Sequence, residues 1–413
     1  MLVGLIIVSA WIGSSPPNLQ FRRMPAPPQK VEDKAPAGPP TPWFNKDEDT
    51  FDLPTDPKHR ADLERDIKEG KKFAAEVLKD TKASTNMEYQ QRVERLGQII
   101  AHIANHTHAI ALWGDKRFSP FHYRYTVLQG DDVNAFSLPG GYIFVYEGLM
   151  KFVESDDELA GILAHETSHA AFRHVATLER QANQQLFYEI PALIAAILAR
   201  SPEVAMGVSA TAQAFQSGWS ISAEKAADYG GFQFMSKSQY NPVAMLTFME
   251  RLAMKDGFFD RVLNNTIMQT HPVTKERALA MIDDLKAAGI PIQRSKASPS
   301  FRVLLIDAKD GTVDAYFNKT KIYKFAGPDA RKRAEAAVPI LNSFYDSVPE
   351  LYQVTPDAVT SAICFKGVPV FTVDRQDAEA LNIPERKLMD STVTAIKGSL
   401  FNLNYFVWQP EGS

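Results

Sequence analysis

Residues 156–181 read DDELAGILAHETSHAAFRHVATLERQ, and no proline or glycine follows Gly161 in this stretch. Its apolar residues recur at helical spacing and predict one helix over residues 156–182 with a buried face. His165 and His169 stand four residues apart, so a helix carries both imidazoles on one face, one turn apart. Two imidazoles placed in this way can bind one metal ion, and Glu166 can face a water molecule bound there.

An acidic motif further along the chain decides how this histidine pair is interpreted. A bare H-E-x-x-H also occurs as a solvated feature of unrelated helices, whereas a catalytic zinc site needs three protein ligands. Glu224 and Asp228 stand four residues apart in SAEKAAD, which also predicts a helix. One carboxylate can bind zinc while the other accepts the second N–H of a ligand histidine. Taken alone, Glu224 and Asp228 could be an ordinary pair of solvated acidic side chains. Only the two motifs together favour a metal site.

The two motifs, H-E-x-x-H followed by E-x-x-A-D, resemble the gluzincin peptidases of the CAAX-prenyl-protease type. That family includes the bacterial heat-shock membrane protease and the periplasmic chaperone-proteases of outer-membrane assembly, and the latter branch is the most similar. The resemblance runs from about residue 66 to residue 285. Its other matching blocks are Glu69-Gly70-Lys71, VNAFSLPGG at 133–141, Glu158-Leu159-Ala160, Arg173-His174, and His271-Pro272 with Arg277. The family often has Ser-Arg shortly before the third ligand, whereas this chain has Ser220-Ile221, which puts a local salt bridge in doubt.

The resemblance implies a metal site with one zinc ion per chain. His165, His169 and Glu224 would bind the ion. Glu166 would be the general base, because zinc lowers the pKa of a bound water to near ~7 and a carboxylate can then accept its proton. Asp228 would orient a ligand histidine through a hydrogen bond.

The resemblance also implies residues that meet the substrate. His271 and Arg277 would lie near the metal, where they could stabilise the oxyanion, or His271 could instead cap the zinc in a resting enzyme. An edge strand would pair with an extended peptide and so select its backbone. The residues of that strand are Asn134, Ala135, Phe136, Ser137 and Leu138.

These features predict a zinc-dependent endopeptidase that hydrolyses peptide bonds of protein substrates. We expect the substrates to be unfolded or envelope proteins, and the role to be protein quality control at the cell envelope. The alternative is a chaperone-like binding module that uses the same cleft and cleaves little or under a gate. Glu166 is present, which disfavours an inactive enzyme.

Composition excludes several other classes of protein. The 413 residues are 45% apolar and 23% charged, which is typical of a globular protein, and the net charge of -4 suggests no nucleic-acid partner. The single cysteine, Cys364, excludes an internal disulfide and a cysteine-cluster metal site. No internal repeat is evident in the sequence.

The chain divides into four segments. Residues 1–14 form an apolar run that is shorter than the ~20 residues of a membrane span, and it predicts a signal or an anchor. Residues 15–58 are a proline-rich linker. We expect an α+β fold, with a mostly helical zincin-like metallopeptidase domain and a small sheet at 59–290, and an α+β accessory domain at 296–413. The protein is expected to be exported and periplasmic or membrane-associated, although the missing basic residues at its start leave a cytoplasmic location open.

Other segments carry weaker expectations. The apolar stretch 185–216 is broken by charges and prolines, so it predicts either a core helical hairpin or a lid that touches the membrane surface. His102, His106 and His108 have metal-like spacing but are expected to lie at the surface or cap a helix. His174 is expected to form structural hydrogen bonds.

Overall fold

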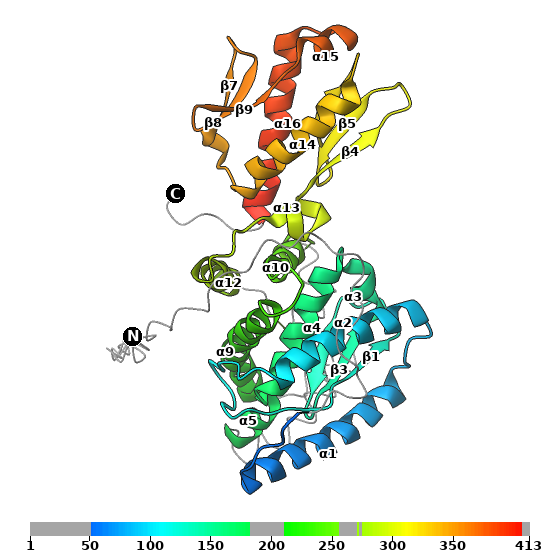
Figure 1. Ribbon diagram of the computed structural model, residues 1–413, viewed down its shortest axis with the longest axis vertical. Helices are drawn as coiled ribbons and strands as arrows, with labels where there is room; N and C mark the ends of the chain where they lie inside the picture. The colour runs from blue at the N-terminus through cyan, green and yellow to red at the C-terminus, as the bar shows by residue number, and fades with distance from the viewer. Residues whose placement is uncertain (1–50, 182–209, 256–270, 272–274, 407–413) are drawn as a thin grey trace, which may run out of the picture.

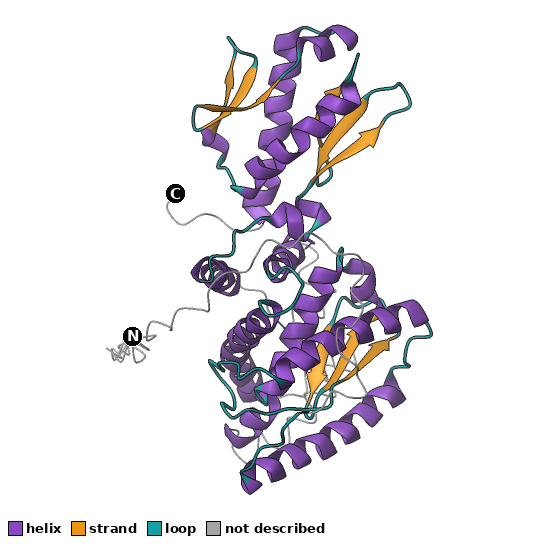
Figure 2. Cartoon of the chain, viewed as in Figure 1, coloured by secondary structure: helices purple, strands orange, loops and turns teal. Residues whose placement is uncertain are grey.

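A computed structural model describes residues 51–181, 210–255, 271 and 275–406, and its side chains pack into two large cores. The first core runs from Leu63 to Ala297 and the second from Phe301 to Leu400. The two parts follow each other along the long axis of the molecule, the first at the bottom and the second at the top of Figure 1. Helices dominate the first part and small sheets flank the helices of the second (Figure 2), so the predicted α+β class is confirmed.

The first part consists of helices around one small sheet. Its helices are α1 (Pro57–Asp80), α2 (Met87–Asn105), α3 (Glu147–Phe152), α4 (Asp156–Ala171), α5 (His174–Gln181), α9 (Ala210–Met235), α10 (Val243–Lys255), α12 (Lys275–Ala287) and α13 (Arg294–Ala297). Its strands are β1 (Arg124–Leu128), β2 (Ala135–Leu138) and β3 (Tyr142–Tyr146). The sheet order is β1-β3-β2, with β1 parallel and β2 antiparallel to β3. Strand β2 is therefore at an edge of the sheet.

Helix α1 packs against the tight turn between β2 and β3 because a glycine sits at the contact. A Cβ atom on Gly70 would lie 1.8 Å from the carbonyl oxygen of Pro139. On the other side, Gly140 has a φ of 73° and a Cβ there would lie 2.5 Å from Cα of Ile67. Backbone meets backbone at this contact, which fixes α1 to the end of the edge strand.

The predicted single helix over residues 156–182 is wrong. Helix α4 ends at Ala171, Arg173 has a φ of 50°, and α5 begins at His174. A left-handed backbone is costly for a residue with a side chain, so other interactions must hold Arg173 there. Its buried guanidinium group makes several ion pairs, described below, and they stabilise this break.

The second part repeats one order of elements twice. An antiparallel sheet of β4 (Val303–Asp307), β5 (Val313–Phe317) and β6 (Thr320–Phe325) leads into α14 (Ala330–Asp346). A second antiparallel sheet of β7 (Val354–Asp357), β8 (Ala362–Phe365) and β9 (Val368–Thr372) leads into α15 (Arg375–Ala380) and α16 (Glu385–Phe406). The middle strand of each sheet carries an irregularity in register, between Ala315 and Tyr316 and between Ile363 and Cys364.

Buried polar contacts hold the segment that leads from the first part into the second. Arg294 of α13 donates to both oxygens of Glu250 of α10, at 2.7–3.0 Å. Glu154, just before α4, accepts hydrogen bonds from the hydroxyl groups of Ser298 and Ser300. The segment that leads into the second part is thus held by α10 and by the start of α4.

Several predictions concern segments for which no structure is described. Residues 1–14, most of the linker 15–58 and most of the stretch 185–216 lie outside the described residues. Among the helices that are described, none has both the length and the apolar character needed to span a membrane.

Candidate metal centre

Helix α4 presents the two histidines of the H-E-x-x-H motif side by side. Its first turn is capped by Ser155, whose hydroxyl accepts from the Glu158 N–H, and most of its residues are buried. Nε2 of His165 and Nε2 of His169 are 3.0 Å apart. Both rings therefore direct the same nitrogen to one point, as the helical spacing predicts.

Helix α9 brings a carboxylate to that point. Oε2 of Glu224 lies 3.3 Å from Nε2 of His165, and Oε1 lies 3.2 Å from Nε2 of His169. The close approach of α9 to α4 requires Gly231, where a Cβ would lie 3.1 Å from the backbone nitrogen of His165. Two helices distant in sequence thus share one cluster of donor atoms.

His271 completes the cluster. Its Nδ1 lies 3.0 and 3.1 Å from the two oxygens of Glu224, and its Nε2 lies 3.5 Å from Oε1 of Glu166. The donor atoms of His165, His169, Glu224 and His271 all lie within 4.8 Å of one another. This is the only such group of three or more potential ligands found in the part of the chain that the structure describes.

The carboxylates of this cluster are held by an arginine. Arg277 of α12, which is 3% exposed, donates to both oxygens of Asp228 at 2.7 and 2.8 Å and also lies 3.0 Å from Glu224. The remaining ring nitrogen of His165, Nδ1, lies 3.0 Å from Asp228. These contacts support the orienting role predicted for Asp228. They favour a positioning role for Arg277 over direct contact with an oxyanion.

The electrostatics of the centre favour a bound cation. Burial opposes protonation of His165, but Glu224 and Asp228 outweigh it and raise the pKa of its imidazole to about 10. Burial likewise opposes ionisation of Glu224, yet His271 and Arg277 hold the pKa of its carboxyl well below its usual range. The negative potential that stabilises a protonated imidazole would equally stabilise a divalent metal ion.

His174 orients the second histidine of the motif, in line with the hydrogen-bonding role expected for it. Its Nε2 lies 3.2 Å from the carbonyl oxygen of Trp113 and its Nδ1 lies 2.8 Å from Nδ1 of His169. Burial lowers the pKa of His174 well below its usual value, so the ring is neutral. A carbonyl only accepts, so Nε2 of His174 donates to it and Nδ1 accepts from His169. Nε2 of His169 is left as a lone pair that faces the cluster.

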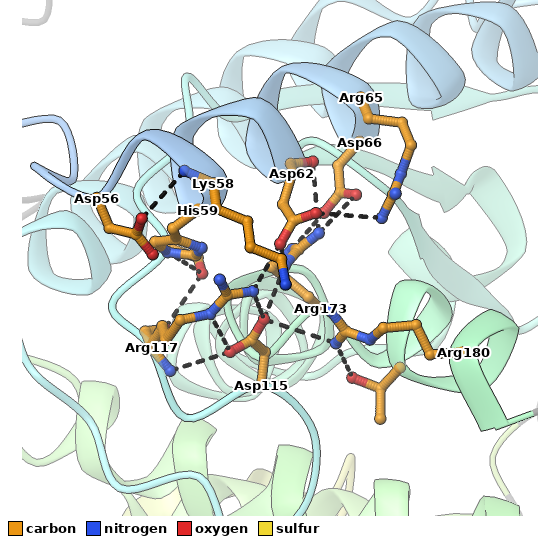
Figure 3. A network of polar contacts seen from close by, with 12 residues as sticks. Asp56, Lys58, His59, Asp62, Arg65, Asp66, Asp115, Arg117, Arg173 and Arg180 are labelled. Carbon is orange, nitrogen blue, oxygen red and sulfur yellow. Dashed lines mark hydrogen bonds and ion pairs between the residues drawn. The ribbon is translucent and has the colours of Figure 1, made fainter.

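An ion-pair network holds Arg173 and hence the position of His174 (Figure 3). Arg173 donates to both oxygens of Asp66 in α1 and, at 2.7 Å, to Asp115. Arg117 binds Asp115 and, at 2.8 Å, Asp62 of α1. Burial opposes the charged form of Asp115, but hydrogen bonds from Arg117 outweigh it and hold the pKa of Asp115 well below its usual range. Helix α1 and the segment around residue 115 are thus fastened to the end of α4.

One oxygen of Glu166 stands apart from these contacts. Glu166 is 2% exposed, and among the described residues its Oε2 has no hydrogen-bond partner. A buried carboxylate oxygen without a partner is unusual, because its desolvation is not compensated. Beside a metal cluster, such an oxygen can accept a proton from a water molecule.

Strand β2 presents an edge near α4. Its register pairs Ala135 with Val145 and Leu138 with Tyr142, and within the described residues no strand pairs with its other side. Ala135, Phe136 and Leu138 are buried, Ser137 is half-buried, and the carbonyl oxygen of Asn134 accepts from the Tyr146 N–H. One side of β2 is therefore without a paired strand in the described part of the chain, and its pairing with an extended peptide stays a prediction.

The other histidines lie apart from the cluster. His106 is the C-terminal cap residue of α2, and its Nδ1 lies 2.8 Å from the carbonyl oxygen of His102. His108 packs its ring against Phe118. These positions agree with the surface and capping roles expected for them.

The donor set fits zinc. Zinc prefers imidazole nitrogen and carboxylate oxygen in a tetrahedral arrangement, and two histidines with one glutamate leave a position for water. His165, His169 and Glu224 supply these donors, and Oε1 of Glu166 lies 3.5 Å from Nε2 of His271, which belongs to the same cluster.

A helix that carries two such histidines, with a neighbouring carboxylate able to take a proton from water, defines a metal-dependent hydrolase of the H-E-x-x-H class. Comparison with known families is more specific. Residues 91–284 match Peptidase family M48. The matched range includes every residue predicted for the metal site.

Individual relatives agree with this family. The Beta-barrel assembly-enhancing protease of Escherichia coli (strain K12) is 30% identical over 165 residues, which are 38% of this chain and 33% of that protein. Mitochondrial metalloendopeptidase OMA1 of Schizosaccharomyces pombe is 34% identical over 151 residues, 37% of this chain and 43% of that protein. The matched stretches thus span between a third and a half of these relatives.

Proposed function

We propose that the protein is a zinc-dependent endopeptidase that hydrolyses internal peptide bonds of protein substrates. The observation that carries this proposal is the unpaired, buried oxygen of Glu166 beside a cluster of two histidines and a glutamate. The match of residues 91–284 to Peptidase family M48 supports it. When bound, zinc supplies Lewis acidity that polarises a carbonyl and brings the pKa of water near ~7.

Side chains of the protein carry out the proton transfers and orient the ligands. Oε2 of Glu166 accepts the proton of the attacking water and returns it to the nitrogen of the leaving amine. Asp228 and His174 keep the rings of His165 and His169 in the tautomers that leave Nε2 as the ligand atom.

The substrate is proposed to bind as an added strand. An extended peptide that pairs with β2 is recognised through its backbone, which suits a protease that meets many sequences in unfolded chains. The bacterial relatives are named for enhancing β-barrel assembly and the yeast relative for a mitochondrial location. By similarity to them, we propose unfolded envelope proteins as substrates and an envelope location for this protein.

The proposal is tested by metal analysis combined with casein cleavage for wild type, Glu166→Gln and Glu224→Ala. Wild type should hold one zinc per chain and cleave casein. Glu166→Gln should keep its metal and lose roughly 10²-fold or more of the activity, because an amide cannot accept the proton. Glu224→Ala should lose the metal. If wild type and Glu166→Gln both bind unfolded casein and neither cleaves it, the result would contradict the endopeptidase and favour a chaperone-like binding module.

A further inference from the structure

The break between α4 and α5 carries an arginine where glycine would suffice for the turn. Arg173 is 2% exposed and has a φ of 50°, a left-handed backbone that is costly for a residue with a side chain. Glycine adopts this conformation without that cost, so the arginine side chain indicates a role beyond the turn itself. Its guanidinium group binds carboxylates on two other segments of the chain, helix α1 and the loop around residue 115 (Figure 3).

The contact with α1 is made to a single buried carboxylate. Arg173 donates from Nε at 2.5 Å and from Nη2 at 2.9 Å to the two oxygens of Asp66, which is 1% exposed. A paired contact of this kind fixes the direction of both side chains. Nη2 also lies 3.4 Å from the carbonyl oxygen of Asp62, one turn earlier in α1. Because Asp66 precedes residue 91, this anchor lies outside the residues that match the peptidase family.

The second contact is made to residues 113–115, which lie directly against the end of α4. Asp115 accepts from Nη1 of Arg173 at 2.7 Å. Its backbone N–H donates to the carbonyl oxygen of Phe172, also at 2.7 Å. The side chain and the backbone of one residue therefore hold two consecutive residues at the break.

The same segment also contacts the start of α5. The carbonyl oxygen of Trp113 lies 3.2 Å from Nε2 of His174. Gly114 has a φ of 101°, and a Cβ there would lie 2.7 Å from Cδ2 of His174 and 2.5 Å from the carbonyl oxygen of Phe172. Only a residue without a side chain allows this approach. A shift of residues 113–115 would carry the Trp113 carbonyl away from His174.

A chain of buried contacts thus leads from α1 to the metal cluster. Asp66 and Asp115 hold Arg173, and the next residue, His174, accepts from Nδ1 of His169 at 2.8 Å. The first four of these residues are each less than a tenth exposed, so bulk water does not replace a contact that is lost. The direction in which Nε2 of His169 faces the cluster therefore depends on two carboxylates far from it in sequence.

We propose that Asp66 and Asp115 are positioning residues of the metal centre, and that helix α1 belongs to the zinc-binding unit. Through Arg173 they hold His174 where it orients His169. This role rests on the proposed function, because it takes the cluster to bind zinc, and it extends the functional unit beyond the matched residues. If the contacts only stabilised the fold, their loss would lower the free energy of unfolding and leave the zinc affinity of the folded protein unchanged.

Zinc affinity of the full chain tests the proposal, measured by competition with a chromophoric chelator under conditions where every variant is folded. Asp66→Asn should lower the affinity by about tenfold, the lower end of the range for an orienting partner, because it acts through two other residues. The matched control is Glu250→Gln. Glu250 is also 1% exposed and accepts from Arg294 through both oxygens. This variant should lose stability and keep the zinc affinity of wild type.

Cobalt in place of zinc gives a second readout, because the visible absorption of Co²⁺ reports the geometry of its ligands. At full occupancy, Asp66→Asn should change the cobalt spectrum and Glu250→Gln should not. Arg173→Gly removes the guanidinium group but suits the left-handed backbone, so the turn can remain. If Asp66 acts through Arg173, the double variant should lose no more zinc affinity than Arg173→Gly alone.

The outcomes separate this proposal from the proposed function. If Asp66→Asn does not fold, Asp115→Asn serves the same comparison, since it keeps the paired contact between Arg173 and Asp66. Zinc affinity and a cobalt spectrum equal to those of wild type in the folded variant overturn the positioning role. Additive losses of affinity in the double variant overturn the route through Arg173. Absence of zinc binding by wild type instead overturns the proposed function.

Discussion

Nδ1 of His174 lies 2.8 Å from Nδ1 of His169, and through this contact a backbone carbonyl at Trp113 determines which nitrogen of His169 faces the metal cluster. The residue that orients a ligand is thus five positions from it in sequence but lies across a break in the helix.

His174→Ala should therefore weaken zinc binding by about 10–100-fold, the range seen when a partner of a ligand histidine is removed. His174→Asn should restore part of this loss, because its amide oxygen can accept the N–H of His169. Competition with a chromophoric chelator measures both. The matched control is His106→Ala, at the exposed end of α2. Equal zinc affinity in wild type and His174→Ala would contradict the orienting role.

Arg277 holds two carboxylates of the metal centre, and replacing it should lower both the zinc content and the stability of the protein. Arg277→Lys keeps the charge but loses the paired hydrogen bonds to Asp228. Arg277→Met leaves two buried carboxylates without their counter-charge and should lower the free energy of unfolding by about 3–5 kcal/mol. Urea unfolding and zinc content are the measurements. Unchanged zinc content with a fall in kcat alone would instead indicate that Arg277 contacts the oxyanion.

His271 lies close enough to the three ligands to bind the same ion, and this favours a capping role. We expect His271→Ala to raise basal casein cleavage, because it frees the fourth position for water. The comparison requires variants matched in zinc content. A fall of roughly a hundredfold would indicate that His271 stabilises the oxyanion instead. An unchanged rate would remove it from both roles.

Two glycines in helices give opposite predictions for the same substitution. Gly70→Ala should destabilise the protein, because its Cβ would overlap the Pro139 carbonyl oxygen and push α1 from the edge strand. Gly398 is exposed in α16 with nothing within 4 Å of an added Cβ. Gly398→Ala should therefore stabilise the protein by about 0.5–1 kcal/mol. Thermal unfolding of both variants tests the pair, and a Gly70→Ala protein as stable as wild type would contradict the close packing.

Elements whose signal is local were predicted well from the sequence. The apolar periodicity of residues 87–110 predicts a helix, and α2 spans Met87–Asn105. The turn of Pro139, Gly140 and Gly141 between two apolar runs predicts the strand pair β2 and β3, which the structure has. The approach of His165 to His169 follows from helical geometry alone.

Features that depend on distant contacts were not predicted. No glycine or proline marks the break at Arg173, because it is stabilised by Asp66 and Asp115, which lie 107 and 58 residues away in sequence. The carbonyl of Trp113 could not be found from residue types, since any residue supplies a carbonyl. The repeated order of sheet and helix after Phe301 has no evident sequence repeat, because strands of four to six residues tolerate many apolar sequences.

The buried ion pair between Arg294 and Glu250 limits where recombination between genes could replace the C-terminal part of the chain by another domain. Glu250 is 1% exposed, so a recombination point before Arg294 would leave its buried carboxylate without a counter-charge. This would lower the free energy of unfolding by about 3–5 kcal/mol. A crossover placed after Ser300 would keep Arg294, Ser298 and Ser300 with their partners Glu250 and Glu154, and it would separate Ser295 from Asp346. The unit that is inherited together thus extends about 13 residues beyond the end of α12 at Ala287, the last helix of the metal centre, and recombined descendants should retain that extension whatever follows it.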